Sequence, residues 1–113
     1  MTDHGLYDED LETIRAVLAN FADEIIQVDL FGSRATGNHR RNSDVDLVIH
    51  GDVREASIAR MWTLFNESNL PFSVDVTSYE RLTHRPLKEH IDAVGRCLFS
   101  AQEIRKGRKT RGT

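Results

Sequence analysis

Two short stretches decide the fold of this chain: FGSRATG at residues 31–37 and SDVDLV at residues 43–48. The first begins where an apolar, β-branched run over residues 25–31 ends, and this run predicts a strand that stops at Gly32. The second opens a run over residues 44–50 in which apolar side chains alternate with carboxylates, which predicts a strand with one polar face. Turn-forming residues between the two strands predict a short helical turn and then a polar loop.

The sequence on either side of these two strands supplies the remaining elements. Apolar residues recur with helical spacing over residues 11–21 and again over residues 58–65. Residues 72–77 alternate as a third strand, a proline and a glycine frame a last helix over residues 86–95, and residues 97–99 add a final short strand. The order predicts an α+β (α/β-like) domain, a small mixed β-sheet packed with helices.

Single residues within these elements carry further expectations. Asp52 and Glu55 resemble a capping box at the start of the second long helix. Trp62 is expected in the core, and Cys97 is expected to be a small buried apolar residue.

Length and composition limit the class of protein. The 113 residues suit one domain, and 39% hydrophobic and 29% charged residues are ordinary for a soluble globular chain. No apolar run approaches the roughly 20 residues that span a bilayer, and the polar N-terminus is unlike a signal peptide. A single cysteine excludes an internal disulfide framework and a multi-cysteine metal site. We therefore expect a cytoplasmic protein that does not bind membranes.

The charge is unevenly distributed along the chain. Residues 105–113 hold five basic side chains, which leaves a net charge of −8 for the remaining residues because the whole chain carries −3. This predicts a single domain over residues 1–104, followed by a basic, disordered tail over residues 105–113. The acidic body argues against a broad nucleic-acid-binding face.

The polar face of the second strand offers a metal site. Asp44 and Asp46 lie two residues apart on one face, roughly 6–7 Å apart along the backbone. Such carboxylates repel each other unless a cation lies between them, and Mg²⁺ prefers carboxylate and phosphate oxygens. Asp75 lies on the polar face of another strand, and a strand beside the first would add a third carboxylate. Two ions held in this way suit in-line phosphoryl transfer.

The end of the first strand offers a phosphate site. Gly32 lets the backbone approach a ligand closely, and the helical turn that follows presents N–H groups and the Ser33 hydroxyl to phosphate oxygens. Arg34 comes next in the sequence, and Arg40 and Arg41 lie in the following loop. Each feature alone is also explained by a solvated strand face or by helix capping, and the combination is what favours a phosphoryl-transfer site.

The pair Gly32-Ser33, the ten residues that follow it and the triplet Asp44-Val45-Asp46 resemble the hallmark of a known family. This is the minimal nucleotidyltransferase (MNT) branch of the DNA polymerase β superfamily, and Asp75 matches its third carboxylate. The resemblance implies the nucleotidyltransferase fold and a catalytic set of Asp44, Asp46 and Asp75. It also implies that two Mg²⁺ ions bind to these residues, and that Gly32 and Ser33, with Arg34 as a weaker match, bind ATP or another NTP.

The resemblance also implies a partner. Such proteins are typically encoded beside a helical HEPN protein, and in characterised pairs the MNT protein is an antitoxin that transfers AMP from ATP to a tyrosine of the HEPN toxin. By this resemblance we expect the chain to be a protein adenylyltransferase. We also expect that it can assemble into an oligomer. Two alternatives remain open: a nucleotide-binding antitoxin that acts by occlusion alone, and a nucleotidyltransferase for a small molecule such as an antibiotic.

Overall fold

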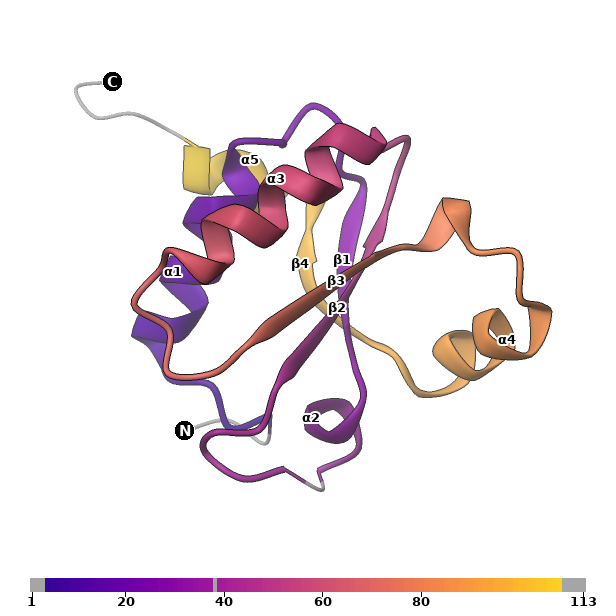
Figure 1. Ribbon diagram of the computed structural model, residues 1–113, viewed down its shortest axis with the longest axis horizontal. Coiled ribbons are helices and arrows are strands. Elements are labelled where there is room, and N and C mark those ends of the chain that lie inside the picture. Colours follow the sequence, from indigo (N-terminus) through magenta and orange to yellow (C-terminus); the bar gives the residue numbers. More distant parts are fainter. Residues whose placement is uncertain (1–3, 38, 109–113) are drawn as a thin grey trace.

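A mixed sheet of four strands, counted over the described residues 4–37 and 39–108, forms the centre of the computed structural model (Figure 1). The strands are β1 (Gln27–Phe31), β2 (Val45–His50), β3 (Val74–Ser78) and β4 (Arg96–Ser100). They lie in the order β3-β2-β1-β4, with β1 antiparallel to β2 and β4, and with β2 parallel to β3. The predicted strands and the α+β class are confirmed.

Three helices gather on one side of this sheet: α1 (Asp8–Ala19), α3 (Glu55–Asn66) and α5 (Ala101–Arg108). Helix α1 packs against α3 and α5, and α3 packs on β3. The short helix α2 (Ser33–Thr36) connects β1 to β2, and η1 (Tyr79–Arg81) and α4 (Arg85–Val94) connect β3 to β4. Figure 1 shows α4 standing beside the sheet, away from the other long helices. None of the helices in the described part of the chain is long and apolar enough to cross a bilayer.

The C-terminal helix α5 is an element that the sequence analysis does not anticipate. Its Ile104 is fully buried in the core, which anchors the helix to the body of the protein. The helix continues through Arg108, so the boundary expected after residue 104 falls inside it. Of the basic tail predicted over residues 105–113, the last five residues lie outside the described part of the chain.

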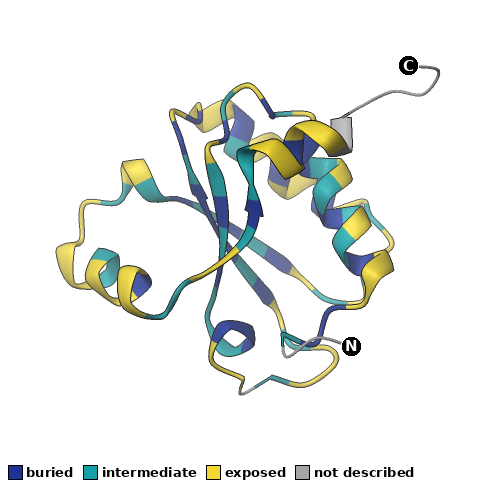
Figure 2. Ribbon diagram, turned by 180° about the vertical axis from the view of Figure 1, so that it is seen from behind, coloured by how far each residue is buried: buried dark blue, intermediate teal, exposed yellow. Residues whose placement is uncertain are grey.

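Alternate strand residues face the helices and form the core. The buried side chains on this face of the sheet are Val28, Leu30, Val45, Leu47, Ile49, Val74 and Val76, and they meet Ile14, Leu18, Met61 and Phe65 of the helices. Figure 2 shows this alternation as dark and light bands along the strands. Because successive strand residues point to opposite faces, Asp46 and Asp75 lie on the face away from the three helices.

The start of α3 differs from the predicted capping box. Asp52 does not cap the helix, which begins at Glu55 with Arg54 as its N-cap residue. The carboxylate of Glu24, a residue 30 positions earlier, holds this end instead. It accepts hydrogen bonds from the backbone N–H of Arg54 at 2.9 Å and from the Ser57 hydroxyl at 2.9 Å.

The expectations for Trp62 and Cys97 are wrong. Trp62 is 39% exposed on the outer side of α3, because the stripe that faces the core runs through Met61 and Phe65. Cys97 is exposed on β4.

We expect Glu24→Gln to lower the free energy of unfolding at pH 7 by about 1 kcal/mol, a typical cost of losing a helix cap. The hydrogen bond from Arg54 leads the interactions that lower the pKa of Glu24 below its ordinary value of 4.5. A lowered folded-state pKa means that this contribution is present above the unfolded-state pKa and is lost as the pH falls through the folded-state value. Urea denaturation at pH 7 and at pH 3 measures both effects.

Glu67→Gln is the matched control, since Glu67 is an exposed carboxylate at the other end of α3. Equal stability of the Glu24 and Glu67 variants at pH 7 would contradict the capping role of Glu24.

Candidate active site

The parallel pairing of β2 with β3 brings two of the predicted carboxylates together. Asp46 of β2 is the register partner of Asp75 of β3, so the two side chains lie on the same face of neighbouring strands. Asp44 lies one residue before β2 begins and is exposed. The three acids therefore share the end of the sheet where β2 starts, with Asp46 in the middle.

The charges at this end of the sheet are uncompensated. Burial, the charge of Asp75, the hydrogen bond with Asp75 and the charge of Asp44 together raise the pKa of Asp46 from 3.8 to about 6. Every one of these causes disfavours the ionised form of Asp46. A cation placed among the three carboxylates would reverse the imbalance, because it favours the ionised form.

Gly32 makes room for Asp46. It lies at the end of β1 with φ 77° and ψ −153°, and a Cβ atom built on it would meet Oδ2 of Asp46 at 2.3 Å. A side chain at this position would therefore both strain the backbone and displace the carboxylate. Ser33 follows as the first residue of α2 and is partly exposed, so the predicted Gly32-Ser33 pair lies beside the carboxylates.

Arg34 lies apart from this group. Its side chain is fully buried, and its guanidinium donates hydrogen bonds to main-chain carbonyl oxygens of the N-terminal segment and of the loop before β2. The structure therefore does not present this guanidinium to a phosphate group beside Asp46.

The donor set fits Mg²⁺ in its chemistry. Asp44, Asp46 and Asp75 offer only carboxylate oxygens, the ligands that hard divalent cations prefer. In the described part of the chain, no three His, Cys, Asp or Glu side chains already converge on one point as a metal site. Binding of an ion by all three aspartates would therefore require their carboxylate groups to move closer together.

An aromatic pair, Phe31 and His90, lies on the β1 side of Asp46 and was not anticipated. Phe31 is the cross-strand partner of Asp46, and the His90 ring of α4 meets the Phe31 ring edge-on at a centroid distance of 5.4 Å. Phe31 could have been found from strand alternation, since it directly precedes Gly32. His90 could not, because only the tertiary fold brings α4 to this end of the sheet.

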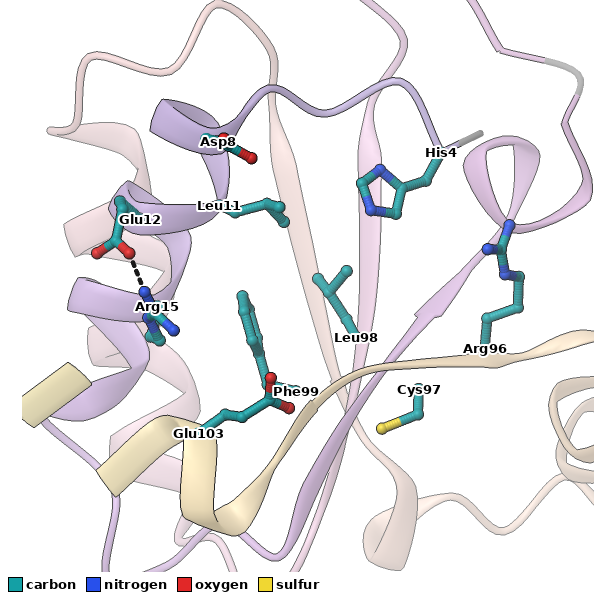
Figure 3. Close-up of a pocket in the computed structure, with 10 residues that line it drawn as sticks. All are labelled: His4, Asp8, Leu11, Glu12, Arg15, Arg96, Cys97, Leu98, Phe99 and Glu103. Atoms are coloured by element: carbon teal, nitrogen blue, oxygen red, sulfur yellow. Dashed lines mark hydrogen bonds and ion pairs between the residues drawn. The ribbon is translucent and has the colours of Figure 1, made fainter. Parts of the chain in front are cut away.

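Other polar features lie outside the site. His50, at the far end of β2, pairs with Asp29 of β1 at 2.8 Å. A pocket of about 560 Å³ lies beside α1, β4 and α5. Figure 3 shows its apolar side chains, Leu11, Leu98 and Phe99, flanked by charged residues of both signs. None of the three aspartates lines this pocket, and its mixed charges do not form a second carboxylate cluster.

Comparisons with known proteins bear on the fold and the family. A family model described as polymerase beta, nucleotidyltransferase, matches residues 12–104. A solved structure described as the crystal structure of the toxin-antitoxin with AMP-PNP is 20% identical in sequence with a TM-score of 0.66, over 88% of this chain and 81% of that chain. Likeness at this identity shows a shared fold. No curated protein matches the chain.

We expect Asp46→Asn to raise the melting temperature of the metal-free protein at pH 8. The folded-state pKa of Asp46, about 6, lies above its ordinary value of 3.8, so wild-type stability falls as the pH rises through 6. The amide removes the repulsion, and the gain should shrink towards zero as the pH falls to about 3, below the ordinary value of 3.8, where Asp46 is mostly protonated in both the folded and the unfolded wild type. Thermal unfolding in chelator between about pH 3 and pH 8 measures this.

Asp52→Asn, at an exposed position after β2, is the matched control and should leave the pH profile unchanged. A melting temperature of Asp46→Asn at or below that of wild type at pH 8 would show that the carboxylates do not destabilise one another.

Proposed function

The chain belongs to the polymerase beta nucleotidyltransferase family, and from this membership and the site geometry we propose that it is a metal-dependent enzyme that transfers AMP from ATP to a hydroxyl group. The observation that carries the proposal is the paired Asp46 and Asp75 beside Gly32. This pair lies within the family match, and its unbalanced negative charge suits a site that binds cations and a triphosphate.

Five of the six predicted residues have a role in this proposal, and Arg34 is not one of them because its guanidinium is bound to main-chain carbonyl oxygens. Asp44 and Asp46 would hold both Mg²⁺ ions, and Asp75 would complete the coordination of one of them. When bound, the ions neutralise phosphate charge and lower the pKa of the attacking hydroxyl. Gly32 and Ser33 bind the triphosphate, with the backbone of Gly32 close to the Asp46 carboxylate because the glycine carries no side chain.

The chemical step balances as a substitution at the α-phosphorus of ATP. The acceptor oxygen forms a bond to the α-phosphorus, and the bond from this phosphorus to the oxygen bridging to the β-phosphate breaks. Pyrophosphate leaves with the electron pair of that bond. The proton of the acceptor hydroxyl passes to a nearby carboxylate, and Asp75 is our candidate for this base.

We propose a tyrosine of a HEPN-type toxin as the acceptor, so that the chain acts as an antitoxin and a protein adenylyltransferase. Two observations support a protein acceptor. The solved structure with the same fold is described as a toxin–antitoxin with AMP-PNP, an ATP analogue. Asp44 is exposed, and the carboxylates lie on the face of the sheet that α1, α3 and α5 leave uncovered, which an external acceptor can approach.

The test combines the purified chain, ATP, Mg²⁺ and the product of the neighbouring gene. We expect the mass of the partner to rise by one or more AMP groups. Asp44→Asn, Asp46→Asn and Asp75→Asn should each reduce the rate by at least about 100-fold, because each removes charge stabilisation from the transition state. Asp52→Asn should match wild type.

The same variants distinguish the alternatives. If they protect cells from the partner as well as wild type does, the partner is neutralised by occlusion and the catalytic antitoxin proposal is wrong. If the partner is unmodified and a small hydroxylated molecule, such as an antibiotic, gains AMP instead, the chain is a small-molecule nucleotidyltransferase.

A further inference from the structure

A buried guanidinium lies next to the proposed nucleotide site without entering it. Arg34 is fully buried, and its desolvation is the largest cause that lowers its pKa from the ordinary value. The guanidinium of Arg34 donates its hydrogen bonds to main-chain carbonyl oxygens. Cζ of Arg34 lies 4.9 Å from the centroid of the Phe72 ring. A buried cation with this set of partners organises the backbone around it.

Most of these carbonyl groups belong to the loop that leads into β2. Nε of Arg34 donates to the Ser43 oxygen at 3.2 Å, and Nη2 donates to the same oxygen at 3.0 Å. Nη2 also donates to the oxygens of Arg41 at 2.7 Å and Arg40 at 3.2 Å. Ser43 immediately precedes Asp44, so the guanidinium holds the backbone one residue away from a proposed metal ligand.

The remaining contact joins this loop to the N-terminal segment. Nη1 of Arg34 donates to the His4 oxygen at 3.0 Å. Gly5 follows with φ 76°, and a Cβ atom built on it would lie 2.3 Å from Nε2 of His39 and 2.9 Å from Nη1 of Arg34. The N-terminal segment and the loop before β2, which are far apart in sequence, therefore both contact the Arg34 side chain.

An ion pair between Asp10 and Arg41 reinforces the same junction. Asp10, buried in the first turn of α1, accepts a hydrogen bond from the backbone N–H of Tyr7 at 3.0 Å and pairs with Nη1 of Arg41 at 2.9 Å. The guanidinium of Arg41 also lies 4.4 Å from the Tyr7 ring. The loop is thus fastened to the start of α1 through Arg41 and to α2 through Arg34.

We infer that Arg34 is a positioning residue that sets the place of Asp44. This inference rests on the proposed function, because it gives Asp44 a metal to hold. Arg34 acts through the backbone of residues 40–43 and touches neither substrate nor metal. Lysine cannot replace it, because an ammonium group lacks the planar fork whose N–H groups point at several carbonyl oxygens at once.

The first arm of the test measures the loop directly by amide hydrogen exchange of the metal-free full chain. In wild type the N–H of Arg40 is bonded to the Ser43 hydroxyl and the N–H of Ser43 to the Arg40 oxygen. We expect Arg34→Lys to speed exchange at both amides by about tenfold or more, the effect of losing a charged hydrogen bond. Exchange in α3 and β3 should match wild type.

The second arm measures Mn²⁺ binding by titration calorimetry, in the absence of ATP and partner. We expect Arg34→Lys to raise the Kd for Mn²⁺ by about 10- to 100-fold, as substitutions behind metal ligands do. The matched control is Arg40→Lys, the same chemical change at an exposed arginine of the same loop, which should leave exchange and Kd as in wild type.

Gly5→Ala tests the contact between Arg34 and the N-terminal segment through a change in that segment. It crowds His39 and Arg34 without altering the guanidinium, and we expect it to speed exchange at Arg40 and Ser43 in the same pattern, with a smaller rise in Kd.

Three outcomes would overturn the inference: unchanged exchange at Arg40 and Ser43 in Arg34→Lys, faster exchange throughout the core, or equal Kd values for Arg34→Lys and Arg40→Lys. The proposed function fails separately, if the wild-type chain binds Mn²⁺ yet transfers no nucleotide to any acceptor. The exchange arm decides the role of Arg34 in that case as well.

Discussion

The repulsion between Asp46 and Asp75 is the constraint on which the structure of this site depends. Two carboxylates in register on adjacent strands destabilise the sheet that carries them, and burial together with the charge of Asp75 raises the pKa of Asp46 to about 6. The strands stay paired because their other face is buried: Val45 and Leu47 on β2 and Val74 and Val76 on β3 pack under the helices. The apolar core therefore keeps Asp46 and Asp75 side by side on neighbouring strands before any cation arrives.

The two-residue period of a strand explains how one segment serves both purposes. A shift of one residue in the pairing of β2 would place Val45 on the open face and Asp46 in the core, so burial of the apolar face fixes the position of the carboxylates. The same alternation sets Phe31 across from Asp46, and the chain then turns at Gly32, where a side chain would collide with the carboxylate. The order of residues through β1 and β2 therefore meets two requirements at once: apolar side chains face the core, and the carboxylate and the glycine meet on the open face.

Sequence reasoning succeeded where the information is local and fell short where it is not. The alternation of apolar and polar residues predicts the strands and places Asp46 and Asp75 on polar faces. The ten residues between Gly32-Ser33 and the Asp44-Val45-Asp46 triplet match the family hallmark, which predicts that the glycine shares a site with these carboxylates. The cap on α3 comes from Glu24, 30 positions away, so the nearer Asp52 appeared to be the better candidate. Helix α5 was missed because its composition is basic and its buried Ile104 gives no periodic signal. Arg34 follows Gly32 and Ser33 in sequence, yet its direction is set by the His4 and Ser43 carbonyls that tertiary folding brings to it.

Two arginines close in sequence to the site are engaged away from the carboxylates. Arg34 is hydrogen-bonded to main-chain carbonyl oxygens, and Arg41 pairs with Asp10. An arginine paired with Asp46 would lower its pKa and would compete with a metal ion for its oxygens. All the causes found for the pKa of Asp46 act to raise it instead. Binding the buried guanidinium through the backbone therefore leaves the acids with their full negative charge, and the strongest attraction the site can exert is for a cation from solution.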